Sequence, residues 1–280
     1  MTPATQHAEQ RVAPSAFGDD ARRFFYLTLT LARTDFKLRY FGSALGYVWS
    51  LVRPLLFFGV LYVVFTQVFK AGKGVPHYPL YLLTAIVMWN FFLETTSGSV
   101  QCLLYREGLL RKMRFPRLVI PLSVSLTALF NLGMNFIVVV IFALATGVYP
   151  RASWLEMPVL VGLLAILAVG IGMLLSVLYV RFRDIQPIWD VTAQILFYAS
   201  PIIYTAKTYP ASVVRIAMLN PIAMITTQMH KAFIDPNAHS AARVAGGAAR
   251  LLIPLAIIAA VAVLGTRVFT REAPRIAENL

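Results

Sequence analysis

The chain has 280 residues, of which 59% are hydrophobic and 13% are charged, and its mean hydropathy is +0.71. A soluble globular chain carries about a quarter charged residues, so this composition excludes that class and predicts a polytopic membrane protein. The net charge of +13 comes from basic residues between apolar segments, which favours membrane lipids as partners and argues against nucleic acid. The single cysteine, Cys102, permits no disulfide within the chain.

The first residues predict a tail followed by an amphipathic helix. Residues 1–18 contain no apolar run of signal-peptide length, so we expect an uncleaved, disordered cytoplasmic tail. From 19 to 42, a polar sector and an apolar face alternate with helical period, which predicts an interfacial helix. The polar sector holds Arg22, Arg23, Thr30, Arg33, Thr34 and Lys37, and the apolar face holds Phe24, Leu27, Leu31 and Leu38. Asp35 and Arg39 are spaced for an i,i+4 ion pair. A charged anchor without mechanical work is the alternative interpretation.

Six segments are long and apolar enough to cross a hydrocarbon core of about 30 Å, which needs about 20 residues. They are 45–69, 79–104, 118–148, 154–180, 185–203 and 246–270. Most of the 25 lysines and arginines fall on one side if both termini are cytoplasmic. The positive-inside rule therefore predicts a multi-pass protein of a bacterial inner or plasma membrane. The lengths of the apolar segments predict an all-α protein with a single transmembrane domain over 19–280.

Between the fifth and sixth segments the apolar pattern breaks into two short pieces, 210–219 and 221–234. Each is about half the length of a span, and a proline stands at each junction. One interpretation is a re-entrant hairpin over 204–236, buried in protein. An amphipathic extracellular loop is the other, and the sequence favours neither.

Sequence motifs for catalysis are missing from the chain. The string nearest to a phosphate-binding loop, AGKG at 71–74, lacks the first glycine and the hydroxyl residue. Zinc, nucleophile-elbow and Mg²⁺-carboxylate patterns are also absent from the sequence. We therefore expect a chain that is not an enzyme and that binds no cofactor or metal of its own.

Five strings in order carry a resemblance to a known family. They are RTDFKLRYFGSALGYVWSLVRPLL at 33–56, LLYREGLLRKMRFPRLVIPLS at 103–123, VRFRDI at 180–185, SPIIY at 200–204 and LNPIAMI at 219–225. Together they resemble the type 2 ABC exporter permeases of the O-antigen, capsule and teichoic-acid group. That resemblance implies a six-span homodimer that moves a glycan on polyprenyl diphosphate, such as an O-antigen, galactan, capsule or teichoic acid, out of the cytoplasm. An ABC exporter of a lipid or drug, or a membrane enzyme acting on a lipid carrier, is the alternative.

The same resemblance implies that a separate ATPase subunit holds ATP and Mg²⁺. It would dock on a coupling helix in the cytoplasmic loop 105–117, which mixes basic and apolar residues and is closed by Pro116. The residues expected to contact the ATPase are Arg106, Leu109, Leu110, Arg111, Met113 and Phe115. The alternative is that the charges of this loop only hold topology.

Charged residues inside the predicted spans are costly and point to pairing or function. Glu94 and Asp190 are expected to be buried charges, and a structural ion pair of Arg53 with either carboxylate is the simpler interpretation. The alternative is that Arg53, with Arg39, receives the diphosphate of the lipid carrier, because a guanidinium fork suits phosphate oxygens.

Aromatic residues recur with helical period on the first and fifth predicted spans. They are Phe58, Tyr62 and Phe65 on the first and Phe197, Tyr198 and Tyr204 on the fifth. These rings could line a conduit by stacking on sugars, or could pack helix against helix. On the fourth span Ala168, Gly172 and Ser176 are small at every fourth position, which allows close approach of another helix, and half a pore would need its twin.

Overall fold

The computed structural model describes residues 21–41, 46, 48–70, 72, 74–108, 116–205 and 211–279, and this part of the chain is helical with no strand. The long helices are α1 (Ala21–Tyr40), α2 (Val48–Val63), α3 (Tyr78–Val100), α6 (Val119–Ala145), α7 (Glu156–Arg181), α8 (Ile185–Ala199) and α12 (Leu252–Asn279). The short ones are η1 (Val64–Val68), α4 (Cys102–Tyr105), η2 (Ala152–Leu155), α9 (Ala211–Ala217), α10 (Pro221–Met229), η4 (His230–Ile234), α11 (Ala241–Ala245) and η5 (Ala248–Leu251). The predicted all-α class is confirmed.

Four stretches are long and apolar enough to cross a membrane: Val48–Val68, Val119–Ala145, Ala152–Arg181 and Ala248–Glu272. They correspond to the first, third, fourth and sixth predicted spans. Helix α8 has 15 residues, which is shorter than a full crossing. Helix α3 is long, but Asn90, Glu94 and a run of Thr and Ser lower its hydropathy. A total of six spans therefore stays a prediction.

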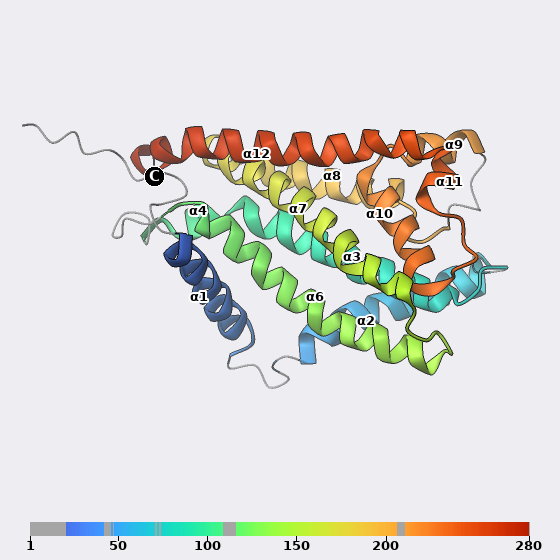
Figure 1. Cartoon of the computed structure of the whole chain (residues 1–280). Coiled ribbons are helices and arrows are strands. Elements are labelled where there is room, and N and C mark those ends of the chain that lie inside the picture. Colours follow the sequence, from blue (N-terminus) through green and yellow to red (C-terminus); the bar gives the residue numbers. More distant parts are fainter. Residues whose placement is uncertain are drawn as a thin grey trace, which may run out of the picture.

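Helix α3 is the centre of the bundle. Most of its residues are buried, and it packs against α6 and α7, with α2 and α8 also in contact. Helix α12 lies along α7, as the long upper helix of Figure 1 shows. The side chains buried around α3, Leu80, Ile86 and Phe92 among them, belong to one apolar core.

The small residues of α7 serve this packing inside the chain. A Cβ on Gly172 would lie 2.7 Å from Ser99 Oγ of α3, and one on Gly265 of α12 would lie 2.4 Å from the carbonyl oxygen of Gly170. Both contacts require glycine, because no side-chain carbon fits at such distances. Gly172, the middle residue of the predicted stripe, thus packs against α3, which is the close approach of another helix that the stripe predicts. A twin subunit stays a prediction.

The predicted interfacial helix is confirmed as a helix in α1, which packs along α6. Its fully buried residues are Thr28 and Ala32, and Thr127 Oγ1 of α6 donates to the carbonyl of Ala32 at 3.3 Å. Phe36 meets Phe130 of α6 edge-on, with ring centroids 5.8 Å apart. Leu38, expected on the apolar face, is 65% exposed. The face of α1 that contacts α6 carries Thr28, Ala32 and Phe36, and Leu38 lies away from it.

The region between α8 and α12 contains the two short helices predicted there, with α10 continued by the π-helix η4, and adds a third, α11. Nearly all of α10 is buried, against α7 and α12, and Asn220 caps it by accepting the N–H of Ile222 at 2.9 Å. This burial in protein is what a re-entrant segment requires. Its depth in a membrane stays a prediction.

The elements are sorted along the long axis of the molecule. Helices α1 and α4 and the C-terminal end of α12 lie at one end of Figure 1, and α9 and α11 lie at the other. Arg181, at the end of α7, pairs with Glu272 of α12 at the first of these ends. The segments that the sequence assigns to the cytoplasm are therefore neighbours in space.

Candidate functional site

A large groove of about 1350 Å³ lies between α2, α3 and α8, and is completed by the end of α1 and the middle of α6. Its wall combines aromatic rings, amides and charges. From α1 and α2 come Arg39, Tyr40, Trp49, Ser50, Arg53 and Phe57; from α3 come Trp89, Asn90, Glu94 and Ser97; from α6 and α8 come Asn131, Asn135, Asp190, Gln194, Phe197 and Tyr198. Such a surface can bind a ligand through both ring faces and hydrogen bonds.

Glu94 is the hub of a polar network in this groove. Its carboxylate pairs with Arg39 of α1, and its Oε1 accepts the amide of Asn131 at 2.6 Å. Tyr40 Oη in turn donates to Asn131 Oδ1 at 2.9 Å. The predicted pairing of Glu94 with Arg53 is therefore wrong. Because α1 packs on α6, its last turn lies beside Glu94, and the carboxylate pairs with Arg39 in place of Arg53.

Asp35 is also paired differently from the prediction. Its carboxylate binds Arg106, at the end of α4, and not Arg39. The two ion pairs Asp35–Arg106 and Arg39–Glu94 join α1 to the start of the predicted coupling loop and to the groove. Leu109, Leu110, Arg111, Met113 and Phe115 lie outside the described residues.

Arg53 lies in the groove on α2, next to the buried Pro54, and its side chain is exposed. Within the described part of the chain, no hydrogen bond or ion pair is formed by its guanidinium. An exposed, unpaired guanidinium in an aromatic groove is available to a ligand anion.

Asp190, expected as a buried charge, is exposed in the groove, where Gln186 Nε2 donates to its Oδ1 at 3.0 Å. The expectation is wrong because the face of α8 that carries Asp190 lines the open groove, together with Ala193 and Phe197.

Two of the six predicted conduit aromatics line the groove. Phe197 is buried, and Tyr198 beside it is 63% exposed. Phe197 contacts Trp89 and Phe57, with ring centroids 5.4 and 6.3 Å apart. Trp89, Phe57 and Trp49 are groove residues that sequence reasoning missed. Trp89 could have been found, because it stands beside Asn90 in an otherwise apolar helix and five residues before Glu94.

The other four conduit aromatics pack within the chain. Phe58 stacks on Tyr62 at 5.7 Å and meets Phe142 of α6 at 6.3 Å. Phe65 meets Tyr204 edge-on at 5.5 Å. These contacts account for the helical spacing of the four rings through helix packing. None of the four is among the residues that line the groove.

Comparison with known proteins gives matches over most of the sequence. The family model described as ABC-2 type transporter matches residues 26–234. The chain is 30% identical over 216 residues to the O-antigen export system permease protein RfbA of Klebsiella pneumoniae, covering 75% of this chain and 81% of that protein. It is 28% identical over 211 residues to RfbA of Myxococcus xanthus, an O-antigen export system permease protein, with 75% and 80% covered. It is 21% identical over 193 residues to the polysialic acid transport protein KpsM of Escherichia coli, with 68% and 74% covered.

The family match runs from within α1 to the end of η4, so it covers every residue that lines the groove. The family model matches well over half of the chain, and four stretches of the structure are able to cross a membrane. The chain therefore belongs to the ABC-2 type transporter family.

Proposed function

We propose that this chain is the permease subunit of an exporter that moves a polysaccharide on a polyprenyl diphosphate carrier out of the cytoplasm. The relatives named for O-antigen export and polysialic acid transport support a polysaccharide as cargo. The observation that carries the proposal is the groove, which combines Trp89, Phe197 and Tyr198 with amides and an available guanidinium. Sugars offer apolar C–H faces and a rim of hydroxyls, and this wall matches both.

Arg53 is the proposed contact for the diphosphate, with Arg39 nearby. Arg39 is already paired with Glu94, whereas Arg53 has its fork available for phosphate oxygens. The two residues therefore have separate roles: Arg39 fixes α1 beside the groove, and Arg53 binds the anion.

A second copy of the chain would complete the groove. Outside the groove lining, α2 exposes the apolar side chains of Val60 and Val63, and α8 exposes Val191 and Ile195 in the same way. A homodimer that buries part of these faces would enclose the path and keep it from lipid. The membrane is proposed to be the bacterial inner or plasma membrane, with both termini cytoplasmic.

The energy is proposed to come from a separate ATPase that binds ATP and Mg²⁺ and docks on the loop 105–117. Changing Leu110 and Met113 together to Ser keeps every positive charge, so insertion should persist while recovery of the ATPase with the permease and export both fall at least tenfold. The control is Leu155→Ser, a 78% exposed leucine on η2 outside this loop. Normal ATPase recovery with the double variant would reject the docking site.

The cargo is tested in the cell. Deleting the gene should trap a lipid-linked glycan inside, identifiable by mass spectrometry of extracted lipids, and the wild-type gene should release it. A deletion strain with an unchanged glycan profile and normal surface polysaccharide would reject the proposed function.

A further inference from the structure

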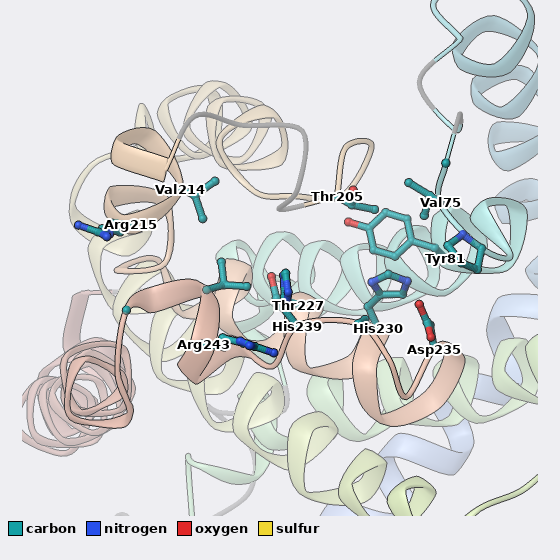
Figure 2. A pocket seen from close by; sticks show the side chains of 15 residues that line it. Val75, Tyr81, Thr205, Val214, Arg215, Thr227, His230, Asp235, His239 and Arg243 are labelled. Carbon is teal, nitrogen blue, oxygen red and sulfur yellow. The ribbon is translucent and has the colours of Figure 1, made fainter.

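A second pocket lies at the end of the molecule away from α1 and α4. It has a volume of about 380 Å³ and lies between the start of α3, α9, the α10–η4 junction and α11 (Figure 2). That volume falls within the range of about 300–1,000 Å³ typical of small-molecule sites. None of its residues belongs to the groove.

One side of this pocket is basic. Arg215 of α9 and Arg243 of α11 both line it, and neither guanidinium forms a hydrogen bond or ion pair with any residue that the structure describes. Gly246 lies beside them with φ of +85°, and a Cβ there would be 3.6 Å from Arg215 Nε. The left-handed backbone favours glycine at this position. His239 adds a further nitrogen donor to the wall.

The opposite side holds a buried hydroxyl. Thr205 is 5% exposed, it lines the pocket, and its Oγ1 has no hydrogen-bond partner among the described residues. Buried polar atoms are seldom left unsatisfied in proteins, so a ligand atom is the natural partner. The neighbouring Tyr81 hydroxyl is already used, because it binds the carbonyls of Pro201 and, at 3.1 Å, Tyr204.

The pocket also contains one carboxylate, that of Asp235. It is buried and its Oδ1 accepts the N–H of Asn237 at 2.9 Å. Figure 2 shows Asp235 at the opposite edge from Arg215, across the width of the pocket. The arginine side is therefore left as the place for an anion.

The surroundings indicate what carries the anion. On α9, Val213 and Ile216 flank Arg215 and are 46% and 70% exposed, so an apolar helix face lies beside the basic side chain. Val214 and Val244 add apolar wall inside the pocket. An apolar exposed face next to an unpaired arginine is typical of a membrane interface, where acyl chains and phosphates meet.

We infer that this pocket binds the phosphate of a phospholipid headgroup, with the basic wall of Arg215 and Arg243 facing the phosphate and Thr205 Oγ1, on the opposite side, donating to another oxygen of the headgroup. The assignment of the pocket to the outer leaflet rests on the proposed function. The assignment of a phosphate as ligand is independent of it. Binding is measured on the purified chain without ATPase or glycan, so a failure of export leaves this result unaffected.

The test uses the full chain in a non-ionic detergent, titrated with dihexanoyl phosphatidylglycerol in a calorimeter. Wild type should bind one molecule per chain, and Arg215→Gln or Arg243→Gln should weaken binding about tenfold or more. The matched control is Arg250→Gln, which removes the same charge nearby. Arg250 does not line the pocket, and its Nη1 donates to the carbonyl of Ala245 at 3.2 Å. Equal weakening by the control, or no binding by wild type, overturns the site.

Two further measurements separate the alternatives. Inorganic phosphate is titrated in parallel: if it binds with the same arginine dependence and the lipid does not bind, the lipid assignment is overturned. Thr205→Val removes the hydroxyl at nearly constant volume, so affinity should fall severalfold while the thermal midpoint stays the same or rises. A lower midpoint with unchanged affinity would show that the hydroxyl is structural and overturn its role.

Discussion

Glu94 lies where three helices meet, and its neighbours determine what its carboxylate does. Arg39 of α1 and Asn131 of α6 both bind its Oε1. The Arg39 side chain is 44% exposed, so water screens the pair and it adds at most about 1 kcal/mol to folding. The consequence is geometric: the last turn of α1 is fixed beside α3.

The role of Arg53 in binding an anion can be tested by substitution. Arg53→Met removes a guanidinium that has no described partner, so the thermal midpoint should change by no more than a degree or two. If the fork holds a diphosphate, export should fall about tenfold or more, because a hydrogen bond to a charged group is worth about 1.5–3 kcal/mol. Arg53→Lys should restore only part of the rate. Surface glycan is measured at equal membrane abundance, and full export by Arg53→Met would exclude the anion contact.

Residue-level reasoning from sequence identified the important charges and misassigned their partners. Glu94, Asp35, Arg39 and Arg53 all stand out, because charges within or next to apolar segments are costly. Which arginine meets Glu94 depends on the packing of α1 on α6, and that packing uses Thr28 and Ala32, which carry no strong pattern. Local spacing therefore predicted Asp35 with Arg39, where the structure has Asp35 with Arg106.

Two ion pairs, Asp35–Arg106 and Arg39–Glu94, connect α1 to the end of α4 and to α3. Asp35→Asn combined with Arg39→Gln removes both ion pairs and leaves the α6 contact face intact. Amide hydrogen exchange of α1 should then speed up severalfold, because each partly exposed pair is worth up to about 1 kcal/mol. Arg33→Gln, which removes an exposed charge from the same helix, is the control. Equal exchange in the double variant and the control would mean that the pairs do not hold α1.

The contact between α7 and α12 depends on glycine. Gly265→Ala would place a carbon 2.4 Å from the Gly170 carbonyl oxygen, which is backbone and cannot turn away. The helices must separate, so we expect a loss of about 1–3 kcal/mol and a clearly lower thermal midpoint. Gly162→Ala, on the same α7, meets nothing within 4 Å and should leave the midpoint unchanged or raise it. Similar midpoints for the two variants would contradict this packing.

Most elements could be predicted from hydropathy and proline alone. The apolar runs fall on α2, α6, α7 and α12, and Pro221 starts α10 as expected. The groove could not be predicted, because it is formed between α2, α3 and α8, and helical spacing on each of them does not tell which helices face one another. The helical repeat of Phe58, Tyr62 and Phe65 is compatible with lining and with packing. In the structure Phe58 packs on Tyr62 and Phe142, and Phe65 packs on Tyr204.

At the scale of the whole molecule, the two ends differ in character. One gathers α1, α4 and the end of α12 with their ion pairs, and the other gathers the short helices around a basic pocket (Figures 1 and 2). The groove opens along α2 and α8 between them. The ion pairs of Arg106 with Asp35 and of Arg39 with Glu94 join the start of the loop 105–117, through α1, to the groove.

The claim that the groove is the path of the glycan is tested most directly by thiol protection. Cys102 is the only cysteine and is buried, so Cys102→Ser gives a thiol-free background. Tyr198→Cys places a thiol in the groove, and Leu155→Cys places one on the exposed η2 outside it. In membranes with the ATPase, loading the lipid-linked glycan should slow maleimide labelling at position 198 severalfold and leave position 155 unchanged. Equal labelling at 198 with and without glycan, at confirmed loading, would contradict the account.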